Sequence, residues 1–386
     1  MKLKTPIFVL LILFLSAAPA LGEGIVEWDP DDITAVEVNP LDQARMIMRQ
    51  MTDEEKIGQL LIVALEDLTG ERITNVLSDP SCIARLPVGG VILYGQNIAS
   101  EMQLKTLIQD LNGGATAAGL YPLFIAVDEE GGSVARVAQK IGLETGASPT
   151  ETGASGQSQM AYQNGRIIGH YLNEYGFNLN FAPVADVLIG KAPDLEGRTY
   201  GTDAQFVAEM ALNMASGLQE EGIIPCYKHF PGHGALDKNA HYAQVRHNRS
   251  LTEMKQNELI PFQAAIDNGA EMIMLSHLTA SAVDKQYPVP MSSLIVTGLL
   301  REEMGFYGVV ITDALRMNAL REGQTLKTAV IRMLNAGVDI LLAPGDGVQV
   351  FGIIKEAVKD GKITMERIEE SVARVLALKI KSGLIQ

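Results

Sequence analysis

Several polar residues lie close after short apolar runs of the sequence, and their types suit nucleophilic and acid–base chemistry. Asp313 and Asp128 each follow a run of apolar, β-favouring residues, and Lys228 is followed directly by His229. A carboxylate can attack an electrophilic carbon, and a positioned imidazole can donate or accept a proton near neutral pH. The residue types therefore indicate a polar site in which a bond can be cleaved.

Such a site needs a scaffold that brings distant parts of the chain together. Eight short β-favouring runs recur along the sequence, and segments with helical apolar spacing separate them. Thr52 and Glu55 form a capping-box pair before the first run, and helices are expected over 203–220 and 294–304. The eight runs cover residues 60–63, 90–93, 123–127, 177–182, 223–227, 272–275, 309–311 and 339–342.

Eight β–α alternations predict fold class α/β, with a single closed (β/α)8 barrel of the TIM type. An open, doubly wound parallel sheet shares this alternation and is the competing interpretation. No Gly-x-Gly-x-x-Gly motif follows an early run, which argues against the dinucleotide-binding form of that sheet. Because catalytic residues of a barrel gather at the carboxyl ends of its strands, we expect the polar residues to converge on one rim.

The segment 228–234, Lys-His-Phe-Pro-Gly-His-Gly, is long and specific, and it resembles glycoside hydrolase family 3. The resemblance extends over about residues 45–382 and is strongest to the bacterial branch of single-domain β-N-acetylglucosaminidases. It implies one barrel over 45–386, without the second α/β sandwich domain of larger members. Further blocks in the family's order are 57–60 (Ile-Gly-Gln-Leu), 89–93 (Gly-Gly-Val-Ile-Leu), 128–132 (Asp-Glu-Glu-Gly-Gly), 197–201 (Gly-Arg-Thr-Tyr-Gly) and 308–315 (Gly-Val-Val-Ile-Thr-Asp-Ala-Leu).

The resemblance implies two catalytic residues. Asp313 would attack the anomeric carbon of a β-glycoside as the nucleophile of a retaining hydrolase. From position alone, an N-cap of the following helix is an equally good interpretation of this aspartate. His241, on the loop after the fifth run, would be the acid/base, whereas by itself it reads as an exposed loop histidine.

The family pattern also implies substrate-binding residues that would hold N-acetylglucosamine. Carboxylates accept hydrogen bonds from sugar hydroxyls, and arginine and lysine donate them. Ion pairing is the alternative for each arginine. Asp186 is interpreted as a residue that holds an arginine or lysine in place, His233 as structural, and the role of His277 stays open. The binding set is Asp128, Arg136, Arg198, Lys228 and His229.

Two positions depart from the family pattern. Ser133 stands where relatives commonly carry an arginine after the Gly-Gly pair. Relatives also place an aspartate two residues before the catalytic histidine, and this chain has Asn239. We interpret Asn239 and Asp237 as catalytic support, because the amide oxygen can orient the His241 imidazole and the carboxylate can supply the missing charge.

A metal centre is the alternative interpretation of the histidines in this region. His229, His233 and His241 could cluster, and the spacing of the first two imitates a helical ligand pair. Pro231 and Gly232 lie between these two and interrupt a helix, so the pair need not share a face. We therefore expect no metal ligands and no cofactor.

Composition and charge exclude several classes of partner. The chain has 386 residues, a hydrophobic content of 47% and a formal net charge of −15, which describes a folded acidic protein. Negative charge repels phosphate backbones and anionic lipids, so neither nucleic acid nor a membrane surface is an expected partner. Cys82 and Cys226 are too few for a disulfide framework and are interpreted as buried free thiols. We expect a carbohydrate substrate and a monomer.

Residues 1–22 have the pattern of a secretory signal peptide. Lys2 and Lys4 precede an apolar run over 7–15, and small residues over 18–20 offer a cleavage site. An uncleaved membrane anchor is the alternative, although the run is shorter than the ~20 residues of a span. Residues 23–44 read as an acidic arm, and the protein is expected to be secreted or periplasmic.

The function predicted from the sequence is that of an exported exo-β-N-acetylglucosaminidase, of the β-N-acetylhexosaminidase type. It would remove terminal N-acetylglucosamine from cell-wall muropeptides or chitooligosaccharides through a covalent glycosyl-aspartate. One alternative is a family 3 phosphorylase or a β-glycosidase of other specificity. Another is a sugar-binding relative of low activity, because Asn239 replaces the usual aspartate.

Overall fold

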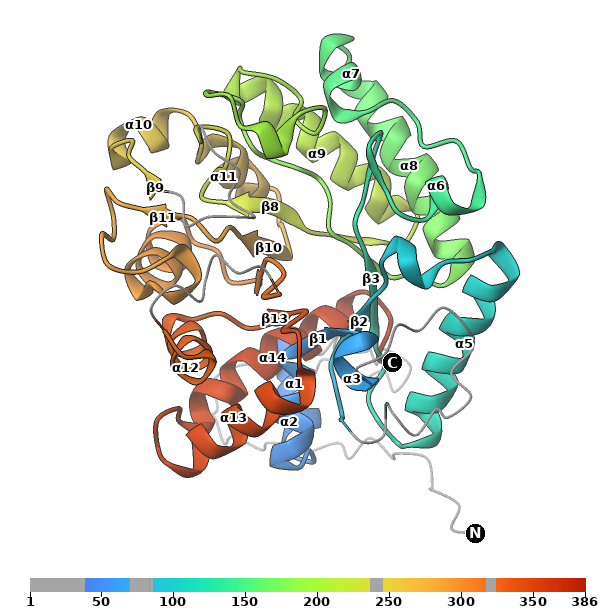
Figure 1. Cartoon of the computed structure of the whole chain (residues 1–386), viewed down its shortest axis with the longest axis vertical. Coiled ribbons are helices and arrows are strands. Elements are labelled where there is room, and N and C mark those ends of the chain that lie inside the picture. The colour runs from blue at the N-terminus through green and yellow to red at the C-terminus, as the bar shows by residue number, and fades with distance from the viewer. Residues whose placement is uncertain (1–38, 70–82, 84–85, 237–245, 317–323) are drawn as a thin grey trace, which may run out of the picture. The chain divides into compact units, whose positions relative to one another are not determined.

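Parallel strands alternate with helices along the chain (Figure 1). The computed structural model describes residues 39–69, 83, 86–236, 246–316 and 324–386. Each of the eight predicted runs contains a strand, so the expected alternation is confirmed. The strands of the ring are β1 (Leu61–Ala64), β2 (Gly90–Ile92), β3 (Phe124–Val127), β6 (Leu179–Asn180), β7 (Ile224–Pro225), β8 (Tyr227–Phe230), β10 (Met272–Leu275), β12 (Val309–Thr312) and β13 (Leu341–Leu342).

Parallel hydrogen bonding joins these strands into a closed ring. Six strands form one sheet in the order β13-β1-β2-β3-β6-β7, and three form a second in the order β12-β10-β8. A parallel bridge from Val184, after β6, to Lys228 links the first sheet to β8. A second bridge, from Ile311 to Ile340, links β12 to the start of β13. The protein is therefore a (β/α)8 barrel, as the sequence predicts.

Helices cover the outside of the ring and follow one another around it in chain order (Figure 1). They are the crossovers that parallel strands require. Within the described part of the chain, no helix is both long and apolar enough to cross a membrane. The longer helices are α1 (Pro40–Met48), α2 (Asp53–Gln59), α5 (Glu101–Ala117), α8 (Ser158–Tyr175), α9 (Ala204–Glu220), α11 (Ile260–Asp267), the π-helix η4 (Leu294–Glu303), α12 (Leu326–Ala336), α13 (Gly347–Lys359) and α14 (Met365–Lys381).

Short elements occupy the connections between strands and helices. Strands β4 and β5 pair with each other in antiparallel fashion, and β9 and β11 form a separate parallel pair. These short elements are α3 (Glu66–Thr69), η1 (Gly95–Asn97), β4 (Glu129–Gly131), β5 (Val134–Ala135), α6 (Ala138–Ile141), α7 (Pro149–Ala154), η2 (Pro193–Leu195), β9 (Arg246–His247), α10 (Leu251–Gln256), β11 (Thr279–Ala280) and η3 (Val289–Met291).

Local sequence signals fix several helix starts. The capping box of Thr52 and Glu55 is formed at the start of α2, as predicted. Asp203 caps α9 by accepting a hydrogen bond from the Phe206 amide at 2.8 Å. The helix expected over 294–304 is present but is wound as a π-helix, a distinction that apolar spacing does not make.

The folded part begins earlier than the predicted boundary between residues 44 and 45. Asn39 caps α1 by accepting from the Leu41 amide at 2.9 Å, and Pro40 takes the first helical position. Helix α1 packs against α14, and Ala44 is fully buried. The last residues assigned to the arm therefore belong to the barrel domain. The rest of the arm and the predicted signal peptide lie outside the described residues.

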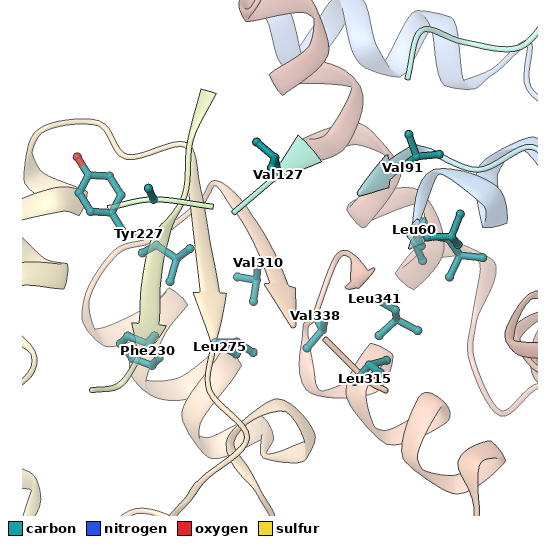
Figure 2. Packing of buried hydrophobic residues seen from close by; sticks show 14 of the residues in the cluster. Leu60, Val91, Val127, Tyr227, Phe230, Leu275, Val310, Leu315, Val338 and Leu341 are labelled. Atoms are coloured by element: carbon teal, nitrogen blue, oxygen red, sulfur yellow. The ribbon is translucent and has the colours of Figure 1, made fainter. Parts of the chain in front are cut away.

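Apolar side chains fill the space on both sides of the strand ring. Figure 2 shows residues of the outer layer, which include Val91, Val127 and Leu341. Alternate residues of the same strands, such as Ile92 and Ala126, belong to a second buried cluster inside the ring. Because side chains alternate between the two faces of a strand, the next inward position of each strand lies at its carboxyl end.

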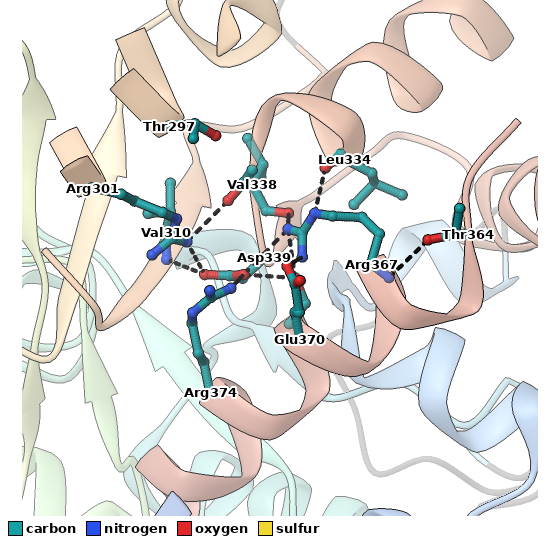
Figure 3. A network of polar contacts seen from close by, with 12 residues as sticks. Thr297, Arg301, Val310, Leu334, Val338, Asp339, Thr364, Arg367, Glu370 and Arg374 are labelled. Carbon is teal, nitrogen blue, oxygen red and sulfur yellow. Dashed lines mark hydrogen bonds and ion pairs between the residues drawn. The ribbon is translucent and has the colours of Figure 1, made fainter. Parts of the chain in front are cut away.

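A buried polar network lies at the opposite end of the ring, where Asp339 precedes β13 (Figure 3). Its carboxylate accepts from Arg301 at 2.6 Å, from Arg374 at 3.0 Å and from the Ser371 hydroxyl at 2.6 Å. Burial alone would raise the pKa of Asp339, but the arginines outweigh it and hold that pKa below its ordinary value. The network joins η4 and α14 to the barrel strands.

Lys379 of α14 is fully buried and has no acidic partner among the described residues. Its Nζ donates to the Gln59 side chain at 2.7 Å and to the Gly89 carbonyl at 2.9 Å, and burial lowers the pKa of Lys379 to about 7. In the unfolded chain this pKa returns to about 10.4. The unfolded state then binds more protons between these two values, so stability should rise with pH from about 7 to about 10.

A comparison of melting temperatures tests this assignment. Over that pH range, the Tm of the wild-type protein is expected to rise relative to that of a Lys379→Met variant, which lacks the titrating group. Below pH 7 the charged lysine exerts its full destabilising effect, so the two profiles should run in parallel there. Profiles that stay parallel up to pH 10 would contradict the lowered pKa of Lys379.

Candidate active site

Three predicted site residues occupy the next inward positions above the inner apolar cluster: Asp128 directly after β3, Asp313 directly after β12, and Lys228 within β8. Asp128, Lys228 and Asp313 each lie two residues beyond a member of the inner apolar cluster. Strand alternation therefore directs all three toward the inside of the barrel at one rim, as predicted. The cluster members beneath them are Ala126, Cys226, which is also the predicted buried free thiol, and Ile311.

Lys228 is the centre of a buried ion-pair network. Its Nζ lies 2.7 Å from Asp128 Oδ1 and 2.6 Å from Glu130 Oε1. Burial alone would lower the pKa of this lysine, but the two carboxylates outweigh it and raise the pKa of Lys228 above its ordinary value. The Lys228 side chain is 2% exposed and that of Asp128 is 23% exposed, so Asp128 is the member of this pair that is open to a ligand.

Glu130 is a buried anchor that the sequence analysis did not select. Arg198 binds its carboxylate with two hydrogen bonds of 2.8 and 2.7 Å. Burial would raise the pKa of Glu130, yet Lys228 and Arg198 outweigh it and hold that pKa at about 2. Arg198 also donates to the Asp194 carbonyl at 2.7 Å. Three of its five N–H groups are thus engaged with described residues, and the structure shows no described partner for the other two.

Asp186 holds the two histidines of the 228–234 segment. One carboxylate oxygen lies 2.7 Å from His229 Nδ1, and the other accepts from the backbone amide of His233 at 2.7 Å. Asp186 does support another site residue, but that residue is His229 and not the arginine or lysine that we expected. The contact of Nδ1 with a carboxylate fixes the orientation of the His229 ring.

Asp186, His229 and His233 are also the described residues whose positions could suit a metal ion. One ligand atom of each lies within 4.8 Å of the others, and all three residues are buried. Both oxygens of Asp186 already accept hydrogen bonds from the loop, including the bond from His229 that a metal ion would have to replace. This arrangement favours a fixed imidazole over a metal centre, and the expectation of no metal stays a prediction.

Asp313 directly follows β12 and is half-buried. Its backbone amide donates to the Leu275 carbonyl at 3.0 Å, which extends the pairing of β10 with β12 beyond the last strand residue. Its Oδ1 accepts from the Ala314 amide at 2.7 Å. The next described helix is α12, whose N-cap is Thr325, so the described residues offer the Asp313 carboxylate no helix to cap.

The remaining predicted residues are placed only in part. Arg136 follows β5 and is half-buried, and its guanidinium makes no hydrogen bond to another described residue. His277, whose role the sequence left open, lies with Nε2 3.1 Å from the Ala314 carbonyl, next to Asp313. The residues that lie outside the described part of the chain are Asp237, Asn239, His241 and Cys82.

Comparison with known proteins gives the class to which this barrel belongs. Residues 52–378 match the family model of the glycosyl hydrolase family 3 N terminal domain. Beta-hexosaminidase A of Pseudoalteromonas piscicida is 31% identical over 371 residues, which cover 86% of this chain and 61% of that protein. A beta-hexosaminidase of Nitrosomonas eutropha is 32% identical over 297 residues, which cover 75% of this chain and 81% of that protein.

A solved structure shares the fold as well. The family 3 beta-N-acetylglucosaminidase of a Paenibacillus species aligns with a TM-score of 0.80 and 32% identity, over 86% of this chain and 63% of that one. The chain thus spans less than two thirds of that protein and of the Pseudoalteromonas hexosaminidase. Because the family model covers most of its length, the chain belongs to glycosyl hydrolase family 3.

Proposed function

We propose that this protein is a retaining exo-β-N-acetylglucosaminidase that removes terminal N-acetylglucosamine from cell-wall muropeptides or chitooligosaccharides. The observation that carries the proposal is the position of Asp128, which is tied to buried Lys228 and directed toward the same rim of the barrel as Asp313. The names of the relatives favour an N-acetylhexosamine as the sugar.

The network suits recognition of a sugar because its charges are fixed before a ligand arrives. Asp128 can accept hydrogen bonds from two hydroxyls of the ring, and charge-assisted bonds of this kind are stronger than neutral ones. Glu130 holds Lys228 and Arg198 in place, which lowers the entropy lost on binding. In this proposal Arg136 and His229 complete the contacts to N-acetylglucosamine.

In the proposed reaction the Asp313 carboxylate attacks the anomeric carbon while His241 protonates the leaving oxygen. The bond to the aglycone breaks, and a covalent glycosyl-aspartate forms. Water then attacks the same carbon as His241 takes its proton, which releases the sugar with retained configuration. Asn239 and Asp237 would orient the imidazole and stabilise its charged form.

A panel of 4-nitrophenyl glycosides tests this function. The protein should release nitrophenol from the β-N-acetylglucosaminide much faster than from the β-glucoside, with and without added phosphate. Formation of a sugar phosphate instead of the free sugar would identify a phosphorylase. Affinity for N-acetylglucosamine without any turnover would identify a binding protein and contradict the proposed activity.

Asn239, which stands where relatives have an aspartate beside the catalytic histidine, leads to a prediction about the leaving group. Because Asn239 supplies no charge, we expect the enzyme to be slow on disaccharides, whose leaving oxygen needs a proton. His241→Ala should therefore lower turnover of chitobiose by about tenfold or more, and turnover of the nitrophenyl glycoside much less. Asn239→Asp should raise turnover of chitobiose, and Asp237→Asn should lower it. Equal chitobiose turnover by wild type and His241→Ala would place the proton donor elsewhere.

We also propose that residues 1–22 direct export of the protein and are then cleaved off. The mature protein would act as a monomer. The support is the basic start, apolar run and small residues of this segment. Amino-terminal sequencing of the protein recovered from the cell envelope or medium should begin after residue 20 or 22. An intact Met1 in that fraction would show that the segment is retained.

A further inference from the structure

Tyr94 follows β2 at the rim of the barrel, next to the segment that carries Asp128 after the neighbouring strand β3. In the pairing of β2 with β3, Ile92 is aligned with Ala126, and Tyr94 and Asp128 each follow two residues further along their segments. The Leu93 amide still donates to the Ala126 carbonyl at 2.9 Å, and Tyr94 itself has an extended backbone.

The side chain of Tyr94 is directed into the barrel mouth. Ile92 and Ala126 belong to the inner apolar cluster, and strand alternation gives Tyr94 the same inward direction. The aromatic ring of Tyr94 packs against this cluster at the rim of the barrel. The predicted nucleophile Asp313 lies two residues beyond Ile311 of the same cluster. Tyr94 therefore lies at the same rim of the barrel as Asp128 and Asp313, near enough for both negative charges to act on its phenol.

The hydroxyl of Tyr94 is a donor that can serve a ligand. No other described residue forms a hydrogen bond to it, whereas the backbone amide of Tyr94 donates to the Asn97 side chain at 2.8 Å. Burial raises the pKa of this phenol, and the negative charges of Asp128 and Asp313 raise it further, with Arg316 acting in the opposite sense. The phenol thus keeps its proton at every pH at which the enzyme would work.

The loop that carries Tyr94 is held in place by its neighbours. The Glu66 carboxylate accepts hydrogen bonds from Gln96 at 2.9 Å and from Asn97 at 3.1 Å. These bonds tie the segment after β2 to the segment after β1. A side chain on such a fixed segment can be positioned before the ligand arrives.

From this placement we infer that Tyr94 is a sugar-binding residue, which donates a hydrogen bond from its hydroxyl to a ring hydroxyl of the N-acetylglucosamine held by Asp128. The inference rests on the proposed function and extends it to a residue that determines specificity. A ring hydroxyl that accepts from Tyr94 can itself donate to the Asp128 carboxylate. Tyrosine and aspartate together would then select sugars that carry a hydroxyl at this position.

Tyr94→Phe removes only the hydroxyl and leaves the packing of the ring unchanged. We expect kcat/KM for 4-nitrophenyl β-N-acetylglucosaminide to fall about five- to tenfold, the usual effect of losing one neutral hydrogen bond, with an unchanged Tm. Tyr121→Phe is the matched control, because Tyr121 precedes β3 at the opposite end of the barrel and should keep wild-type kinetics.

Deoxygenated substrates identify the contact. Among the 3-, 4- and 6-deoxy forms of the nitrophenyl glycoside, one should be turned over equally by wild type and Tyr94→Phe, because its partner hydroxyl is already missing. Unchanged kinetics of Tyr94→Phe, or an equal loss on all three deoxy substrates, would overturn the inference while leaving the proposed function intact.

The contact of Tyr94 with the sugar can be tested even if the proposed hydrolase activity is absent. If the wild-type protein releases no nitrophenol, calorimetric titration with free N-acetylglucosamine replaces the kinetic comparison. A five- to tenfold weaker Kd for Tyr94→Phe would then still support the contact. Equal Kd values, or no binding of the sugar by the wild-type protein, would overturn it.

Discussion

Replacing Asp313 by alanine is expected to lower turnover of every β-glycoside by about a thousandfold or more, including activated aryl glycosides. The carboxylate lies at the carboxyl end of β12 on the inside of the barrel, and the proposed glycosyl-aspartate forms on it. Activated aryl groups leave without protonation by an acid. A loss of activity on aryl glycosides therefore reports on the nucleophile and not on the proton donor. Initial rates with 4-nitrophenyl β-N-acetylglucosaminide measure the effect.

Asp346→Ala provides the control for this experiment. Asp346 also follows a barrel strand, but its carboxylate caps α13 by accepting from the Gln349 amide at 2.8 Å. Its loss should cost about 1 kcal/mol of stability and leave kcat unchanged. If Asp313→Ala behaved in the same way, with a lower Tm and normal turnover, Asp313 would be a helix cap and not the nucleophile.

Replacing Glu130 by glutamine is expected to destabilise the fold by about 3–5 kcal/mol, because it leaves two buried cations without their common anion. Lys228 and Arg198 both bind this carboxylate, and its side chain is 1% exposed. Denaturant unfolding measures the loss, and binding of N-acetylglucosamine should weaken at the same time.

Glu129→Gln is the matched control. Glu129 is equally buried, but its carboxylate accepts from two backbone amides and the Tyr171 hydroxyl, which are neutral donors. Its loss should therefore cost clearly less than that of Glu130. Equal losses in the two variants would show that the charges of Lys228 and Arg198 do not decide the stability of this site.

The pH dependence of Glu130 follows from the same contacts. Its pKa is held at about 2 in the folded protein and returns to about 4.3 in the unfolded chain. The contribution of Glu130 to stability is present above the unfolded value and is lost as the pH falls toward 2.

The barrel could be predicted from the sequence because each strand is a short apolar run of its own. The runs at 90–93 and 123–127 correspond closely to β2 and β3. The boundary before α1 was misplaced because Pro40 suggests an irregular arm, whereas here it takes the first position of a nine-residue helix. The π-helical winding of η4 was missed because its buried residues recur with nearly the spacing of an α-helix.

The buried residues that hold the site in place were harder to predict than the exposed residues that would contact a ligand. Glu130 stands in the Asp-Glu-Glu-Gly-Gly block, yet nothing local distinguishes it from Glu129, because its partners are distant in sequence: Lys228 is in β8, and Arg198 is in the connection between η2 and α9. The pairing of Asp186 with His229 likewise depends on the approach of neighbouring strands. Such contacts follow from the barrel's register, which sequence spacing alone does not define.

Covalent trapping of the intermediate tests the central claim most directly. A 2-fluoro glycoside with a good leaving group should inactivate the protein by forming a stable bond to the nucleophile, because the electron-withdrawing fluorine slows its hydrolysis. Peptide mapping by mass spectrometry should then find the added sugar on Asp313. Labelling of any other carboxylate, or turnover without a covalent adduct, would contradict the account.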